Sequence, residues 1–262
     1  MIVDADAARP PSPLLLAAEW RAVLEFNAFA ASLPLLSTLP KGNGRPVMVL
    51  PGLAAGDMST LPMRMFLKNR GYSVYGWALG PNQGYRPGLK ELKQKRLTEI
   101  HKKHGCKVSL IGWSLGGIYA RQLAKAMPEA VHEVITLGSP FKGHPRSSNA
   151  WRLYESLAGH TVDEIAAIEE IANPPKVPFT SIFSRTDGVV SWECCIEDEG
   201  PTTENIGIEG SHCGLGHNPL AMFVIADRLA QPEGQWQPFN PPSAAVRALF
   251  SDLHEPPRAA AA

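Results

Sequence analysis

The chain has 262 residues, of which 44% are hydrophobic, and this is enough to bury the core of one α/β domain. Its 25 basic and 25 acidic residues give a formal net charge of zero, so charge does not direct the protein to nucleic acid. Apolar runs are too short to span a bilayer, and the acidic start at residues 1–6 lacks the basic region of a secretory signal. We therefore expect a cytoplasmic protein with no nucleic-acid partner and no integral membrane segment.

Strand-like apolar runs alternate with helical patterns along most of the chain, and this alternation predicts a mostly parallel sheet with helices on both faces. The N-terminal helix is rich in Leu, Ala, Trp and Phe, and we expect it to pack on the outside of the core. The first five elements are a helix at 14–33, a strand at 47–50, a helix at 63–69, a strand at 72–78 and a helix at 89–104.

Residues 112–116 read Gly-Trp-Ser-Leu-Gly and lie between a strand-like run, 107–111, and a helical run, 117–124. In that setting the pattern is typical of a nucleophile elbow, a tight turn that projects the serine hydroxyl above the sheet edge. The glycines keep Cβ atoms away from neighbouring backbone, and the helix N-terminus faces the negative charge that forms during acyl transfer. Ser114 is therefore the candidate nucleophile, with an ordinary turn serine as the alternative.

The alternation of strands and helices is interrupted between residues 140 and 178. Within this segment, residues 161–164 read Thr-Val-Asp-Glu, a capping box that predicts the start of a helix with Ile165, Ile168 and Ala172 on one face. We expect a small helical cap over the nucleophile. An ordinary surface crossover is the alternative, because loops of this length are common when they contain helices.

Two later loops supply a candidate acid and a candidate base. Asp187 follows a β-rich stretch, and His212 follows a short apolar strand. A serine hydroxyl is a weak nucleophile until a histidine takes its proton, and a carboxylate holds that imidazole in the useful tautomer. The chain order Ser114, Asp187, His212 is the order found in the α/β-hydrolase fold.

A second histidine, His217, is the rival for the base because it lies in the same loop as His212. It stands at the entrance of a helix that begins with Asn218 as N-cap and Pro219 at the first helical position. His212 comes directly off the strand, so we predict that His212 is the base.

Together these motifs resemble the bacterial esterases and lipases of the α/β-hydrolase superfamily, over residues 45 to 230. The resemblance implies a mostly parallel central sheet with helices on both faces and a small helical cap. One departure is that Pro51 stands where lipases usually carry the His of a His-Gly pair. The resemblance therefore does not extend to the geometry of the oxyanion loop, although it does extend to the catalytic residues. The segments that carry the resemblance are 47–53, 112–117, 136–140, 187–190 and 210–215.

An oxyanion hole needs two backbone donors near the nucleophile. Leu115 follows the nucleophile directly, and the resemblance to lipases implies that the Leu53 amide is the second donor. Large apolar residues near these motifs are the candidate walls of a substrate pocket. They are Trp113, Phe141, Trp192 and Leu215.

The four cysteines lack the paired spacing of a zinc site, so the sequence predicts no metal and no cofactor. Cys195 and Cys213 fall in the acid and histidine loops, and a disulfide between them would brace one loop against the other. Reduced, buried thiols are favoured over this bridge, because we expect the protein to be cytoplasmic.

The predicted organisation is an N-terminal helical extension at 1–44, a hydrolase domain at 45–231 with the cap at about 140–178, and a Pro- and Ala-rich tail at 232–262. We expect the tail to be disordered or to lie on the surface. The predicted function is a serine carboxylic-ester hydrolase that acts on small-molecule esters of short to medium acyl length through an acyl-enzyme. A thioesterase, acyltransferase or amidase with the same triad, and a noncatalytic binding protein of this fold, are the alternatives.

Overall fold

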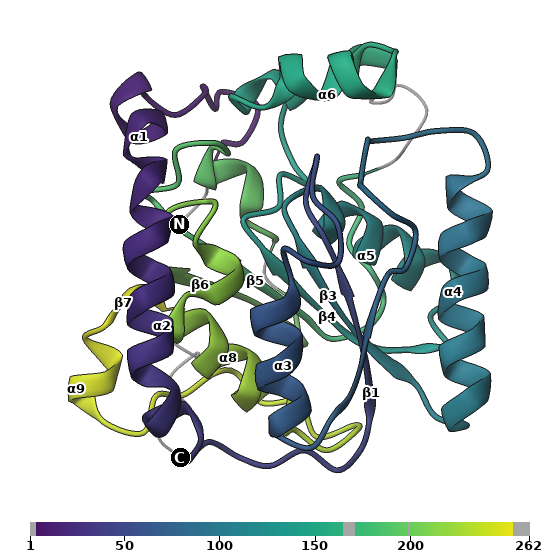
Figure 1. Ribbon diagram of the computed structural model, residues 1–262, viewed down its shortest axis with the longest axis vertical. Coiled ribbons are helices and arrows are strands. Elements are labelled where there is room, and N and C mark those ends of the chain that lie inside the picture. Colours follow the sequence, from purple (N-terminus) through teal and green to yellow (C-terminus); the bar gives the residue numbers. More distant parts are fainter. Residues whose placement is uncertain (1–3, 165–170, 199, 254–262) are drawn as a thin grey trace, which may run out of the picture.

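The computed structural model describes residues 4–164, 171–198 and 200–253. Within them, seven strands form one sheet in the order β2-β1-β3-β4-β5-β6-β7 (Figure 1). Neighbouring strands are parallel, except that β7 pairs antiparallel with β6. The strands are β1 (Pro46–Leu50), β2 (Ser73–Gly76), β3 (Val108–Trp113), β4 (Val131–Leu137), β5 (Phe179–Phe183), β6 (Thr203–Ile208) and β7 (Phe250–Leu253).

The central strands are buried on both faces, which is why they read as continuous apolar runs. In β1, Val47 and Val49 belong to the core on one face of the sheet, whereas Met48 and Leu50 belong to the core on the other face. This alternation follows from the two-residue period of a strand. The predicted mostly parallel, doubly covered sheet is confirmed.

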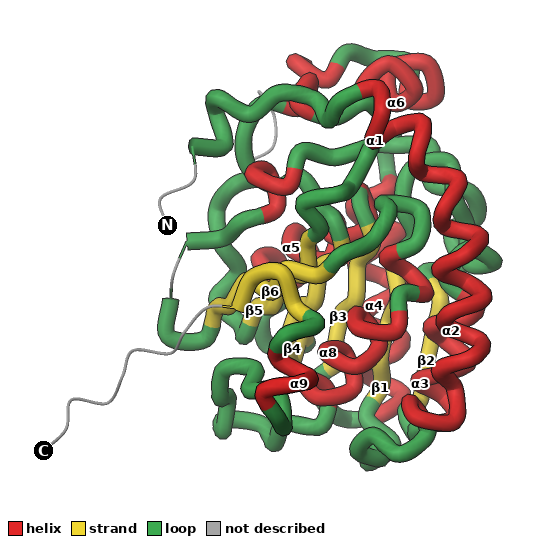
Figure 2. The backbone as a smooth tube through the Cα atoms, turned by 90° about the vertical axis from the view of Figure 1, so that its left-hand side faces the viewer, coloured by secondary structure: helices red, strands yellow, loops and turns green. Residues whose placement is uncertain are grey.

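Helices cover both faces of the sheet (Figures 1 and 2). One face packs against α2 (Ala22–Leu36), α3 (Leu61–Asn69) and α8 (Pro219–Leu229), and the other against α4 (Leu89–His104) and α5 (Leu115–Ala126). No helix among the described residues is both long enough and apolar enough to cross a membrane. The shorter helices are α1 (Pro13–Ala17), η1 (Ala18–Arg21), η2 (Pro145–Ser147), α6 (Trp151–Ala158), η3 (Trp192–Cys195), η4 (Leu215–His217) and α9 (Ala244–Arg247).

Two helices have the ends that were predicted from the sequence. The helix expected at 89–104 is α4, and it ends at Gly105, whose φ of 64° is the left-handed conformation that suits glycine. The Asn218 side chain accepts hydrogen bonds from the Leu220 and Ala221 amides, at 2.9 and 3.3 Å, and so caps α8.

The C-terminal tail contributes a strand to the sheet. Phe250 is buried and packs edge-on against Phe239, with ring centroids 5.1 Å apart. From the sequence we expect a tail that is disordered or lies on the surface. The many Pro and Ala residues make the tail look unstructured, although it contains Phe239 and Phe250, which pack together. The sheet therefore extends beyond residue 231.

The segment predicted as a cap lies beyond the carboxyl ends of the central strands (Figure 1). Its α6 is followed by the expected capping box, in which the Thr161 amide donates to the Glu164 carboxylate at 2.7 Å and the Glu164 amide donates to Thr161 Oγ1 at 3.3 Å. Ile165 and Ile168 lie outside the described residues, and Ala172 follows them in a bend.

Candidate active site

Ser114 lies between β3 and α5, at the carboxyl end of the sheet. Its φ of 53° and ψ of −124° are rare for a residue with a side chain, and such strain is typical of functional sites. The Ser114 amide donates to the Leu137 carbonyl at 2.8 Å, and the Gly117 amide donates to the Ser114 carbonyl at 2.9 Å. Bonds to β4 and within α5 therefore hold the strained residue in place.

Glycines allow the backbone segments around Ser114 to approach closely. A Cβ atom on Gly112 would overlap the first turn of α5, and one on Gly116 would overlap the Leu50 carbonyl at the end of β1. A Cβ atom on Gly52 would lie 3.2 Å from the Ser114 Cβ. Substituting Gly112 or Gly116 would push the elbow away from the sheet, whereas the tighter-than-usual contact at Gly52 would need only a small shift.

Asp187 and His212 form a buried pair at the same edge of the sheet. His212 Nδ1 lies 2.6 Å from Asp187 Oδ2, and the two residues are 7% and 3% exposed. The other carboxylate oxygen of Asp187 accepts the amides of Val189 and Val190 at 2.8 and 2.7 Å. The carboxylate is thus oriented toward the imidazole, and Nε2 is the ring nitrogen left for another partner.

The electrostatic surroundings of His212 favour its protonated form. Burial by itself lowers the pKa of the imidazole, but the charge of Asp187, its hydrogen bond and the charge of Glu19 outweigh burial and raise the pKa above its ordinary value. An imidazole in these surroundings can accept a proton and be stabilised as an imidazolium.

Gly138 and Trp113 bring the nucleophile and the Asp187–His212 pair to the end of β4. Gly138 has a φ of 53°, and a Cβ atom there would lie 3.1 Å from Asp187 Oδ2 and 3.2 Å from His212 Nδ1. The indole N–H of Trp113 donates to the His212 carbonyl at 3.1 Å. Trp113 directly precedes Ser114, so it ties the nucleophile strand to the histidine loop.

The rival histidine, His217, faces away from this pair. Its Nε2 lies 3.0 Å from the Ala22 carbonyl of α2, and its ring stacks edge-on against Phe26 with centroids 5.4 Å apart. Of the two candidate bases, only His212 is placed against Asp187 in the structure.

The two candidate oxyanion donors, Leu53 and Leu115, both line the cavity beside Ser114. Leu115 is the first residue of α5, so its amide has no partner within the helix. The loop that carries Leu53 is braced by buried Asn82, whose side chain donates to the Pro51 carbonyl at 2.9 Å and whose own carbonyl accepts the Ala54 amide at 2.7 Å. Asn82 thus braces the loop on which Pro51 and Leu53 stand, and its place in the sequence did not single it out.

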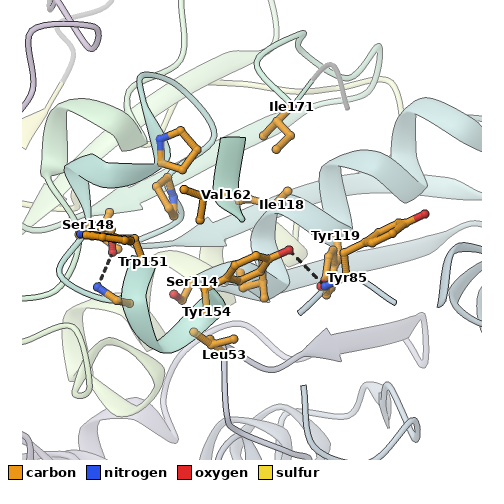
Figure 3. Close-up of a pocket in the computed structure, with 15 residues that line it drawn as sticks. Leu53, Tyr85, Ser114, Ile118, Tyr119, Ser148, Trp151, Tyr154, Val162 and Ile171 are labelled. Atoms are coloured by element: carbon orange, nitrogen blue, oxygen red, sulfur yellow. Dashed lines mark hydrogen bonds between the residues drawn. The ribbon is translucent and has the colours of Figure 1, made fainter. Parts of the chain in front are cut away.

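A cavity of about 790 Å³, a volume that includes solvent at its mouth, opens beside Ser114. Figure 3 shows Trp151, Tyr154 and Val162 from the cap segment gathered beside Ser114. The Tyr154 hydroxyl accepts the Tyr85 amide at 3.3 Å and so ties the cap to the loop after β2. The remaining lining is mainly apolar and includes Ile118, Pro140, Pro145, Ala150, Ile171 and Val190.

None of the four residues predicted as pocket walls lines this cavity. Trp113 holds the histidine loop, and Leu215 is buried in the core, where a Cβ atom on Gly138 would come within 2.7 Å of it. Phe141 packs edge-on against the first residue of β5, and Trp192 stacks on the last residue of β5. The large side chains closest in sequence to the motifs pack against other parts of the protein, and the cavity walls come from the cap together with residues such as Tyr85 and Ile118.

All four cysteines are free thiols, so the bridge considered between Cys195 and Cys213 is not formed. Cys194 and Cys195 are buried as expected of reduced thiols, whereas Cys106 and Cys213 are exposed. Burial and then the charge of Asp187 raise the pKa of Cys195, and burial followed by the charge of Glu19 raises that of Cys213 to about 12. Across the described residues, no group of three or more His, Cys, Asp or Glu side chains is arranged to hold a metal ion.

The N-terminal segment reaches the site, which the sequence analysis missed. Glu19 accepts backbone amides of both the acid loop and the histidine loop, and Glu25 binds Ser211 beside His212. The available signal was the group of charged residues Glu19, Arg21 and Glu25 in a segment that is otherwise mostly apolar.

No model of a protein family and no curated protein matches this chain. Solved structures do resemble it in fold. The monoacylglycerol lipase of Paleococcus ferrophilus is 16% identical, with a TM-score of 0.54, over 73% of this chain and 96% of that chain. A Bacillus licheniformis lipase in its mature form is 19% identical, with a TM-score of 0.53, over 72% and 94%. A metagenome-derived lipolytic enzyme is 14% identical, with a TM-score of 0.56, over 72% and 93%.

Proposed function

We propose that this chain, in which the predicted α/β-hydrolase fold is confirmed, is a serine carboxylic-ester hydrolase. The observation that carries the proposal is the strained Ser114 at the end of β3, with the Asp187–His212 pair at the same sheet edge around Gly138. A serine, a histidine and a carboxylate in these relations are the parts that nucleophilic acyl transfer requires. The structural neighbours named as lipases or lipolytic enzymes support the same reaction class.

The proposed reaction begins with attack of Ser114 Oγ on the ester carbonyl carbon. His212 Nε2 takes the hydroxyl proton, because Nδ1 is engaged with Asp187. The Leu53 and Leu115 amides stabilise the oxyanion, and each such donor contributes about 2.7–4 kcal/mol to lowering the barrier. The tetrahedral intermediate expels the alcohol, which receives the proton from His212, and leaves the acyl group on Ser114. Water, deprotonated by His212, then attacks the acyl carbon, and His212 returns that proton to Ser114 Oγ as the bond to the acyl group breaks and the acid is released.

The cavity indicates an apolar acyl group of limited length. Its lining from α6, Val162 and Ile171 is apolar, and each methylene buried there contributes about 0.8 kcal/mol, or roughly fourfold in kcat/KM. We expect kcat/KM for p-nitrophenyl esters to rise from acetate to a maximum at short to medium acyl length and then to fall. A kinetic series from acetate to palmitate measures this.

A wall variant provides the control for this series. Trp151→Ala removes a large side chain from the cavity, so its maximum should move to longer acyl groups. A steady rise through palmitate, or strong activation at an oil–water interface, would contradict a cap of fixed depth and indicate an opening lid. Absence of turnover with every ester would contradict the proposed function itself.

A further inference from the structure

The carboxylate of Glu19 bridges the two loops that carry Asp187 and His212. Its Oε1 accepts the Gly188 amide at 2.8 Å and the His212 amide at 2.9 Å, and its Oε2 accepts the Cys213 amide at 2.8 Å. Gly188 directly follows Asp187. The Glu19 carboxylate is therefore bonded to His212 itself and to the residue next to Asp187. One half-buried side chain from η1 therefore joins the loop after β5 to the loop after β6.

The next turns of the N-terminal segment add two more attachments. Glu25 accepts the Ser211 amide at 2.8 Å and the Ser211 hydroxyl at 2.7 Å. Arg21 donates to the Thr186 carbonyl at 2.5 Å and to the Thr186 hydroxyl at 3.0 Å, and it pairs with Glu25 at 3.3 Å. The residues held are the immediate neighbours of Asp187 and His212.

These attachments are polar contacts to the two loops and lie apart from the apolar side chains by which α2 packs on the sheet. Glu19, Arg21 and Glu25 contact loops that end at the site, whereas α2 packs on the sheet through buried Phe29 and Leu36. A carboxylate that accepts several backbone amides makes charge-assisted hydrogen bonds, which are shorter and stronger than neutral ones. A strong link at this place constrains the distance between acid and base rather than the fold as a whole.

We propose that Glu19 is a positioning residue, which holds the Asp187 loop and the His212 loop in the register that the reaction needs. The inference rests on the proposed function and adds the N-terminal segment to it as part of the active site. Glu19 does not touch the substrate in this account, and it acts through the backbone of its two neighbours.

The variant that tests it most directly is Glu19→Gln. Glutamine keeps the size of the side chain but has one acceptor oxygen, so its NH₂ group would face the Cys213 amide or the amides of Gly188 and His212. We expect kcat to fall about 10- to 100-fold with KM nearly unchanged, because a small displacement of the base from the nucleophile slows the chemical step.

The pH profile separates this role from general stabilisation. The groups facing His212 are Asp187 from the loop after β5 and Glu19 from η1, and Arg21 and Glu25 contact the adjacent residues Thr186 and Ser211. The charge of Glu19 is one of the causes that raise the pKa of His212. Removing that charge should lower the pKa, so the acid limb of kcat/KM should move to lower pH. Loss of folded protein alone would lower the plateau without moving the limb.

Two further variants complete the experiment. Glu19→Asp keeps the charge but is one methylene shorter, so it should keep the acid limb near its wild-type position while kcat falls. Glu129→Gln alters an exposed glutamate just before β4, at the far end of the sheet, and should match the wild type. The thermal unfolding midpoint of each variant is measured beside the kinetics, and assays are run well below it.

The rate at which a fluorophosphonate labels Ser114 gives a second readout that needs no ester. We expect labelling of Glu19→Gln to slow by about the same factor as kcat, since both require the same base. If Glu19→Gln has the same kcat, the same labelling rate and the same acid limb as the wild type, the inference is overturned while the proposed function stays intact. If the wild type neither turns over esters nor labels, both fail. If it labels without turning over esters, the proposed function fails, and the labelling rates alone decide the inference.

Discussion

We expect His212→Ala to lower kcat for ester hydrolysis by about 10⁶-fold, since removal of a base that acts together with a nucleophile costs nearly as much as removal of the nucleophile. His212 is the histidine that lies 2.6 Å from Asp187, and its pKa is raised by that carboxylate and by Glu19 against the opposing effect of burial. Without the imidazole, nothing takes the Ser114 proton as the hydroxyl attacks. Steady-state kinetics on a short-chain p-nitrophenyl ester measure the loss.

The matched control is His217→Ala, which removes the other histidine of the same loop. His217 contacts the Ala22 carbonyl and the Phe26 ring, both on α2, so its loss should change kcat by no more than a few-fold. If His217→Ala were the inactive variant and His212→Ala the active one, the assignment of the base would be wrong.

The second large effect is expected for Asp187→Asn, which should lower kcat by about 10⁴-fold with little change in KM. The amides of Val189 and Val190 would keep the side-chain oxygen of the asparagine on their side, so its NH₂ group would face His212 Nδ1. Nδ1 would then have to accept a hydrogen bond, and the imidazole proton would move to Nε2. An Nε2 that carries a proton cannot take the one from Ser114.

Asp198→Asn is the control for this substitution, because the Asp198 side chain is 89% exposed and pairs with Lys142 rather than with the site. It should retain wild-type kcat. A rise in KM for Asp187→Asn with kcat preserved would mean that Asp187 acts on substrate binding, and it would contradict the role given to the carboxylate.

Features that depend on neighbouring residues in the chain could be predicted from the sequence. The turn at Ser114 needs glycines on either side, and the α8 cap needs Asn218 before Pro219, so both leave local patterns. The length of α4 follows in the same way from its periodicity and from Gly105.

Features made by distant residues left no such pattern. The Asn82 side chain bonds to the Pro51 carbonyl, 31 positions away in the sequence. The Glu19 carboxylate bonds to the His212 amide, 193 positions away. The walls of the cavity were predicted wrongly for the same reason, because the large apolar residues nearest the motifs in sequence, such as Trp113 and Leu215, pack against other parts of the protein. The cap residues that line the cavity reach it through the fold.

Covalent labelling of the wild-type protein locates the nucleophile, which we expect to be Ser114. The wild-type protein is treated with a fluorophosphonate, digested, and analysed by mass spectrometry to locate the adduct. We expect one adduct, on Ser114, and none in Ser114→Ala. An adduct on Ser139 or Ser211 in the wild type, or labelling that persists in Ser114→Ala, would contradict this assignment.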